Sequence, residues 1–321
     1  MNQEYEHYYV PEQSPWPIVG AVALFFIAVG AGLTVMSVGK EGGSGVYLLY
    51  AGIAVLVYML FSWFKNVISE SDQGLYSAQM DRSFRQGMSW FIFSEVMFFM
   101  AFFGALFYAR VLSVPWLGGA GNNAMTNEVL WPTFEAVWPL VSTPAGETTQ
   151  AMGWQGLPLI NTLILLTSSV TLHFAHVAME NNKRTPLKVF LGATILLGVC
   201  FLGLQVEEYI HAYNDLNLTL DAGIYGNTFF LLTGFHGMHV TLGTVLLFVI
   251  FLRILKGHFT KDKHFAFLCA FFGFAARLSF EAFSISVLFI SYRFAALSKV
   301  FFLYLGYAFF CCARCQSLFF A

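Results

Sequence analysis

Long apolar stretches alternate with shorter polar ones along most of this sequence. A stretch of about 20 apolar residues is long enough to cross a bilayer as a helix. The pattern predicts seven such helices and a weaker eighth candidate at 300–313. The seven cover residues 18–38, 46–64, 88–110, 158–178, 188–206, 224–252 and 265–292. We therefore expect an all-α fold, a polytopic transmembrane helical bundle.

Composition supports this expectation and excludes the soluble class. Of 321 residues, 58% are hydrophobic and only 11% are charged, whereas soluble domains average about 25% charged residues. The first residues, 1–17, are polar and acidic, unlike the basic start of a secretory signal or an Arg-rich transit peptide. We expect a cytoplasmic N-terminal segment at 1–17 and one seven-helix domain at 18–292, since no internal repeat or linker divides it.

The basic residues predict the orientation. Loops after the second, fourth and sixth predicted helices, with their flanks, hold ten of them up to residue 263, and the opposite loops hold two. The ten are Lys65, Arg82, Arg85, Lys183, Arg184, Lys188, Arg253, Lys256, Lys261 and Lys263, and the two are Lys40 and Arg110. The outer side also carries acids, Glu207 and Glu208 among them. Because Lys and Arg accumulate in cytoplasmic loops, the N-terminus is expected in the cytoplasm.

Two of the loops between predicted helices are long, and they differ in composition. Residues 65–87 are predicted to form a mixed-charge inner loop, and residues 111–157 an outer loop rich in Trp and Pro that lies on the membrane surface. Cys311, Cys312 and Cys315 form a cluster near the end of the chain. No histidine follows His264, so we expect no metal site there.

Glu95 is the only formal charge between Arg85 and Arg110, within a predicted helix. A carboxylate near the middle of a transmembrane helix costs roughly 2.5–3.5 kcal/mol on insertion scales, so it usually has a partner or a function. Phenylalanines at helical spacing surround it. A proton-linked or reactive carboxyl is the functional interpretation, and a neutral acid that only packs against another helix is the alternative.

Two histidine pairs at i, i+3 lie in predicted helices: His173 with His176, and His236 with His239. Such spacing can hold a metal ion or haem iron, but no Cys or acid at ligand spacing accompanies the second pair. The first pair lies close to the end of its helix, where water can satisfy it. We therefore expect structural hydrogen bonds and no metal from these four residues.

The sequence contains no motif that indicates another kind of cofactor binding or catalysis. The chain lacks a Walker sequence, a dinucleotide glycine fingerprint and a defensible Ser–His–Asp group. We expect no cofactor or catalytic residue in this chain and no nucleic-acid partner.

Several long motifs carry a family resemblance, in order and at the predicted helix positions. They are SPWP (14–17), WFKNVISES (63–71), RQGMSWFIFSEVMFF (85–99), LPLINTLILLTSS (157–169), HVAMEN (176–181), QVEEY (205–209), GIYGNTFFLLTGFHGMHVTLG (223–243) and HFTKDKHFAF (258–267). Across about residues 10–267 the chain resembles subunit III of the cytochrome c oxidases of the haem–copper family. The loop at 111–157, longer than in mitochondrial versions, favours a bacterial inner membrane over a mitochondrial one.

The resemblance implies an accessory subunit without a metal of its own. Its partners would be subunit I, with haem a and copper, and subunit II, and it would meet cytochrome c only indirectly, through the complex. It would support proton uptake and the stability of subunit I. Helices 1–2 and 3–7 would form a V-shaped cleft that holds phospholipid.

The resemblance also assigns roles to residues. Glu95 matches the buried acid of the family that reacts with carbodiimides. Lipid contacts carry over to Trp63, Glu70, Arg253 and His258. A cationic side chain at a helix end can bind a lipid phosphate, which gives the last two a physical reason.

Residues 268–321 depart from the family pattern. The closing aromatic helix with Trp, His and Asp is replaced by a segment without them, which places Arg277 and Glu281 at i, i+4 and continues into an atypical tail at 293–321. We interpret this as a shifted reading frame or sequence error, and a lineage-specific tail is the alternative.

Three rival functions remain. A homologous subunit of a quinol oxidase or of a nitric-oxide reductase typically lacks the first two helices, which are present here. A proton-coupled transporter using Glu95 would show internal repeats or broken helices. A purely structural lipid scaffold would have no influence on proton uptake.

Overall fold

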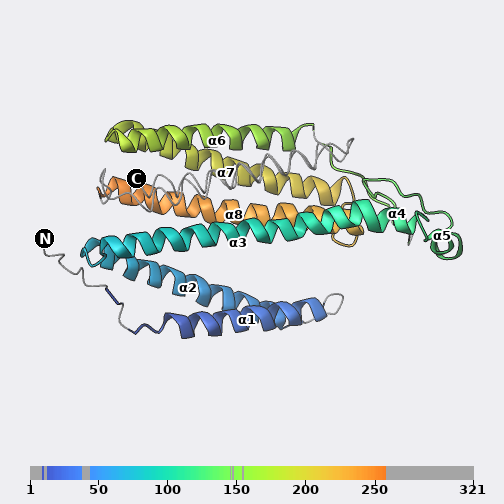
Figure 1. Cartoon of the computed structure of the whole chain (residues 1–321), viewed down its shortest axis with the longest axis horizontal. Coiled ribbons are helices and arrows are strands. Elements are labelled where there is room, and N and C mark those ends of the chain that lie inside the picture. The colour runs from blue at the N-terminus through green and yellow to red at the C-terminus, as the bar shows by residue number, and fades with distance from the viewer. Residues whose placement is uncertain are drawn as a thin grey trace, which may run out of the picture. The chain divides into compact units, whose positions relative to one another are not determined.

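The computed structural model describes residues 9–10, 13–37, 44–144, 146, 148–153 and 155–257. Within them, six helices are long and apolar enough to cross a membrane. They are formed by α1 (Trp16–Met36), α2 (Gly45–Asp72), α3 (Ala78–Tyr108), α6 (Leu157–Glu180), α7 (Arg184–Asn214) and α8 (Ile224–Leu255) (Figure 1). A π-helical turn, η1 (Ala109–Ser113), and two short helices, α4 (Val114–Leu117) and α5 (Ala124–Leu130), follow α3.

The all-helical, multi-span fold is confirmed for the described part of the chain. The predicted helix at 265–292, the candidate at 300–313 and the tail at 293–321 lie outside the described residues. The inner loop predicted at 65–87 is wrong: α2 continues to Asp72 and α3 already begins at Ala78. Hydropathy marks only the part of a helix suited to lipid, and both helices continue into polar sequence.

The same reason corrects the placement of two acids. Glu207 and Glu208 were assigned to an outer loop, but α7 extends to Asn214 and includes both. Glu208 is moreover buried inside the protein, with only 4% of its surface exposed. A carboxyl in a helical position beyond the apolar stretch can therefore still face the core.

The described residues form two compact units, which divide between Phe84 and Arg85. In the first, α1 packs against α2. The contact depends on glycines, because a Cβ on Gly30 would come within 2.4 Å of the Leu49 backbone nitrogen, and one on Gly52 within 2.8 Å of the Ile27 nitrogen. Small residues that let two backbones approach closely are the usual basis of helix packing in membranes.

In the second unit, α6, α7 and α8 lie side by side (Figure 1). The buried positions of α6 and α7 step by four and three residues, the spacing of a continuous helix–helix seam. On α6 they include Asn161, Leu165, Ser168, Leu172, Ala175 and Met179, and on α7 Leu187, Leu191, Thr194, Gly198, Phe201, Glu208 and Ala212. The α6–α7 seam, as we call these two rows, forms much of the core together with α8.

A tight turn joins α6 to α7. The backbone N–H of Lys183 donates to the carbonyl of Ala178 at 2.8 Å, and Asn182 takes a left-handed conformation with φ of 54°. Asparagine is one of the few residues other than glycine that tolerate this conformation. The turn therefore forces α7 to run back along α6.

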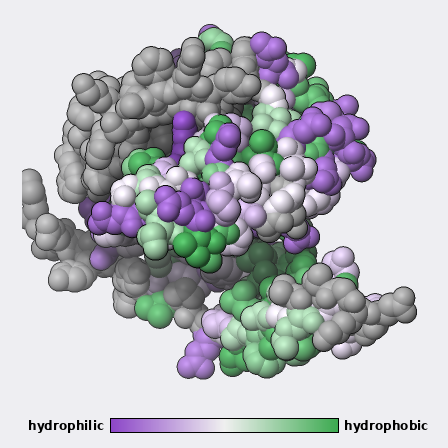
Figure 2. Space-filling view, turned by 90° about the vertical axis from the view of Figure 1, so that its right-hand side faces the viewer, coloured by the Kyte–Doolittle hydropathy of each residue, from purple (hydrophilic) through white to green (hydrophobic). Residues whose placement is uncertain are grey.

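The predicted outer loop has a core of its own. Val114 and Leu140 pack with residues at the adjoining ends of α7 and α8, among them Ala212 and Tyr225. The Met152 N–H donates to the Tyr225 hydroxyl at 3.2 Å. Figure 2 looks onto this end of the molecule and shows hydrophilic residues gathered there among more apolar ones. The segment is thus a folded cap at the ends of α7 and α8.

Candidate functional site

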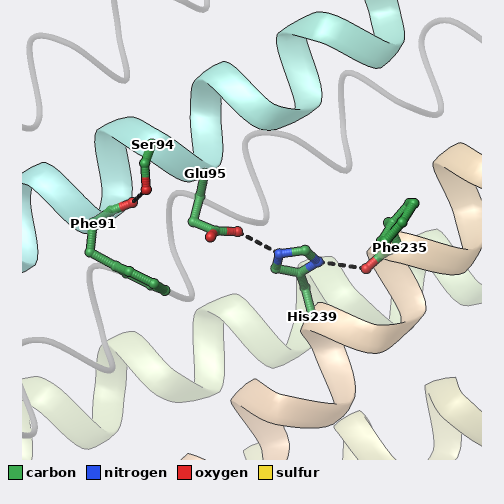
Figure 3. Close-up of polar contacts among 5 residues, drawn as sticks. All are labelled: Phe91, Ser94, Glu95, Phe235 and His239. Atoms are coloured by element: carbon green, nitrogen blue, oxygen red, sulfur yellow. Dashed lines mark hydrogen bonds and ion pairs between the residues drawn. The ribbon is translucent and has the colours of Figure 1, made fainter. Parts of the chain in front are cut away.

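The polar contact with the clearest chemistry joins α3 to α8 in the membrane-spanning part of the second unit. The Glu95 carboxyl oxygen Oε2 and the His239 nitrogen Nε2 form a short hydrogen bond (Figure 3). The His239 side chain is 10% exposed and that of Glu95 is 32% exposed. The acid singled out by the sequence therefore has a partner from another helix.

The second ring nitrogen of His239, Nδ1, determines which atoms of this pair carry a hydrogen. His239 Nδ1 lies 2.6 Å from the backbone carbonyl oxygen of Phe235, which can only accept, so Nδ1 carries a hydrogen and donates it. In a neutral ring Nε2 must then accept from a protonated Glu95. If Nε2 also carries a hydrogen, the pair is an imidazolium and a carboxylate. Either way one proton lies between carboxyl and imidazole, and it can move between them without a change in total charge.

Aromatic rings surround the pair. Phe99 lies 5.1 Å from the His239 ring, centroid to centroid, and Phe98 lies 5.1 Å from Phe235. Phe102 contacts Phe235 at 5.2 Å. These rings join the same two helices as the hydrogen bond.

The remaining predicted histidines lie elsewhere. His236, three residues before His239, packs on Phe201 of α7 with ring centroids 5.7 Å apart, so the i, i+3 pair does not act together. On α6, His173 is exposed and lies beside Phe174, whereas His176 is partly buried and its Nε2 is 3.9 Å from Glu180. In the described residues no group of three or more His, Cys, Asp or Glu could hold a metal ion.

The predicted lipid contacts fall on two units. Trp63 and Glu70 lie on α2 of the first unit, and Trp63 is exposed and stacks on Phe64. Arg253 lies in the last turn of α8 in the second unit. His258 lies outside the described residues.

Glu70 has a partner that the sequence did not indicate. The Tyr76 hydroxyl, in the connection between α2 and α3, donates to the Glu70 oxygen Oε2 at 2.8 Å. Burial, and then the hydrogen bond and negative charge of Glu70, raise the pKa of Tyr76 above that of an exposed tyrosine. The phenol therefore remains a hydrogen-bond donor that holds the carboxylate at the end of α2.

Two features of the site escaped sequence reasoning. Glu95 and His239 were each noted, but nothing linked them. The available signal was that each is a polar group in an otherwise apolar helix, and such groups commonly pair inside a membrane. The buried Glu208 was missed because it follows a polar neighbour near the expected helix end.

Comparison with known proteins identifies the family in which this site occurs. The sequence model of the family described as cytochrome c oxidase subunit III matches residues 6–277, slightly beyond the motifs identified above. The chain belongs to the cytochrome c oxidase subunit III family. The match includes all six long helices and both members of the Glu95–His239 pair.

Relatives within the subunit III family support this assignment along most of their length. The chain is 35% identical over 271 residues to cytochrome c oxidase subunit 3 of Hippopotamus amphibius, which covers 84% of this chain and 91% of the relative. It is 36% identical over 272 residues to that of Loxodonta africana, with the same coverage, and 35% identical over 269 residues to that of Squalus acanthias. As a subunit III homologue, the chain is a membrane protein and part of a larger oxidase complex.

Proposed function

We propose that this chain is a non-catalytic, accessory subunit of a proton-pumping cytochrome c oxidase in a bacterial inner membrane, with its N-terminus in the cytoplasm. Subunits I and II would be its partners, and the haem a and copper that reduce oxygen would belong to those partners. Membership of the subunit III family supports the assembly. The excess of basic residues on one side of the predicted spans supports the orientation.

The observation that carries the proposal is the hydrogen bond between Glu95 and His239. A carboxyl–imidazole pair that shares one proton inside a membrane can take up or release that proton as its surroundings change charge. We infer that this pair assists proton uptake by the catalytic subunit. It has no role in oxygen chemistry, which needs redox groups.

Phospholipid binding is the second part of the proposed function. Trp63 offers an exposed ring to acyl chain, and Glu70, held by Tyr76, offers a fixed acceptor to a headgroup amine. Arg253 at the end of α8 suits a lipid phosphate. The V-shaped cleft that the family resemblance implies is the expected location of the lipid.

Replacement of Glu95 and His239 in the whole oxidase tests the proton role. Glu95→Ala and His239→Phe, reconstituted in vesicles, should lower the proton uptake rate and shorten the active lifetime during turnover. Glu95→Gln should retain the interhelical hydrogen bond but lose the exchangeable proton. Ser94→Ala is the matched control, because the Ser94 hydroxyl is exposed and bonds only to the Phe91 carbonyl of its own helix.

The outcomes separate the rival functions. Unchanged proton uptake and lifetime in all three variants, with the complex intact, would leave only the structural lipid scaffold. A chain that purifies alone and shows no a-type haem absorption in a reduced-minus-oxidised spectrum would contradict the oxidase assignment and favour a transporter. Loss of bound phospholipid in Arg253→Ala, measured by mass spectrometry of the extracted lipids, would support the lipid role separately.

A further inference from the structure

The Glu95–His239 pair has different surroundings on its two sides along the helix axes. Toward one side, α3 leads into the cap through η1 and α4, and α8 begins beside the core of that cap with Tyr225. Toward the other side, the apolar stretch of α3 begins after Arg85, and α8 carries Arg253 in its last turn. We call these the cap side and the basic side of the pair. His239 lies midway along α8 between Tyr225 and Arg253.

Aromatic rings fill the cap side. On α3, Phe98 and Phe99 lie one turn beyond the acid and Phe102 lies one turn further. On α8, Phe235 lies one turn from the histidine. The Phe98 ring contacts the other three, with centroids 5.5 Å from Phe99, 5.0 Å from Phe102 and 5.1 Å from Phe235. These four residues, the four-ring cluster, thus form one continuous layer from α3 to α8.

The basic side has no such layer within the described residues. Phe91, one turn before Glu95, is 53% exposed, and no described ring contacts it. Four residues after His239, where Phe235 is the counterpart on the cap side, α8 has Gly243 and therefore no side chain. Glu95 is also the more exposed member of the pair. An approach to the carboxyl from the basic side therefore meets fewer large side chains than one from the cap side.

We propose that the pair exchanges its proton with water on the basic side only, and that the four-ring cluster closes the cap side. The inference builds on the proposed proton role of the pair. Loss of the shared proton through Glu95 leaves a carboxylate and a neutral imidazole, and its return from the basic side restores the pair. A proton moves along groups that donate and accept hydrogen bonds, and phenylalanine rings are neither. The cluster is therefore a barrier to the proton as well as to water.

Charged groups on the neighbouring helices lie away from the pair. α3 has no other Asp, Glu, Lys, Arg or His between Arg85 and Arg110. His236, on α8, packs on Phe201 of α7. The charged residues and the histidine of α7 lie toward its two ends: Arg184, Lys188, Glu207, Glu208 and His211. Within the described residues, the packing of uncharged side chains therefore distinguishes the two sides of the pair.

The test uses the whole oxidase, oriented in vesicles, with infrared difference spectra recorded after the pH is changed on one side. Glu95→Gln assigns the carboxyl band, because it removes that group. A pH change on the basic side should alter the band, and an equal change on the cap side should not. Phe98→Ala and Phe99→Ala should lose this difference, so that the band responds to both sides. If the latter variant does not assemble, Phe99→Leu, which keeps apolar volume without a ring, is measured in its place.

Phe91→Ala is the matched control, because Phe91 is a ring of the same helix that lies outside the four-ring cluster. It should keep the response to the basic side alone. A band in the parent complex that follows the cap side, both sides equally or neither side would overturn the inference. An unchanged one-sided response in both the Phe98 and the Phe99 variants would overturn the barrier role of the rings. Failure of the proposed function would show separately, as unchanged proton uptake in Glu95→Ala.

Discussion

Replacement of His239 by phenylalanine isolates the energetic contribution of its hydrogen bond to Glu95. Phenylalanine keeps a ring in contact with Phe98 and Phe99, so the aromatic packing is largely preserved while the polar contact is lost. Measured interhelical hydrogen bonds in membranes average ~0.6 kcal/mol and reach ~1.7 kcal/mol. Because the His239 side chain is largely buried but Glu95 is a third exposed, we expect a coupling of about 1 kcal/mol.

A double-mutant cycle measures that coupling. Glu95→Ala, His239→Phe and the double variant would be compared with the parent chain in bicelles, with unfolding by dodecyl sulfate followed by circular dichroism. The loss in the double variant should be smaller than the sum of the single losses by the coupling energy. Glu95→Gln should cost less than Glu95→Ala, because its amide can still donate to Nε2. Additive losses, within the ~0.3–0.5 kcal/mol expected for independent sites, would refute the hydrogen bond as a stabilising contact.

Three further predictions concern other parts of the chain. Gly30→Leu should separate α1 from α2 and lower the yield of folded protein, whereas Gly32→Leu, where an added Cβ meets nothing within 4 Å, should not; equal yields would contradict glycine-based packing. In an ultraviolet titration, Tyr76 should ionise at higher pH than exposed tyrosines, and Glu70→Gln should remove much of that difference. Because the pKa of Tyr76 is raised in the folded state, its contact with Glu70 stabilises the fold below about pH 10 and weakens as pH rises further. A free energy of unfolding that stays constant up to strongly alkaline pH would argue against this contact. Peptide mass spectrometry should fail to find the tail peptide 311–321 if a frame shift produced it, and its detection would exclude that interpretation.

Sequence reasoning predicted the parts of the fold that lipid dictates. The beginnings of α6 and α8 agree with prediction to within one residue, because an apolar stretch follows directly on a proline or glycine signal. The inner loop failed because α2 and α3 continue as helices into polar sequence on both sides of residues 73–77. Hydropathy predicts where a chain enters lipid, and backbone hydrogen bonding decides where its helix ends.

For the candidate site, the sequence predicted the importance of Glu95 but not its partner. Glu95 stood out as a lone charge, but its partner is 144 positions away in the sequence, and composition alone does not pair such distant residues. His239 was grouped with its sequence neighbour His236, whereas the structure places the two rings against different helices. Glu208 was assigned to an outer loop because the predicted helix ended at residue 206, and only the spacing of the buried positions of α7 reveals that it faces inward.

The hydrogen bond from His239 to the Phe235 carbonyl gives the proton pair a built-in spectroscopic reporter. In an α-helix the backbone N–H of residue 239 already donates to the carbonyl of residue 235. This carbonyl therefore accepts two hydrogen bonds from the same amino acid, one from its backbone and one from its side chain. A gain or loss of charge on the imidazole changes the polarisation of that C=O bond. Carbon-13 placed in the Phe235 carbonyl would therefore shift its infrared band with the protonation state of His239, and the backbone itself would record each proton movement.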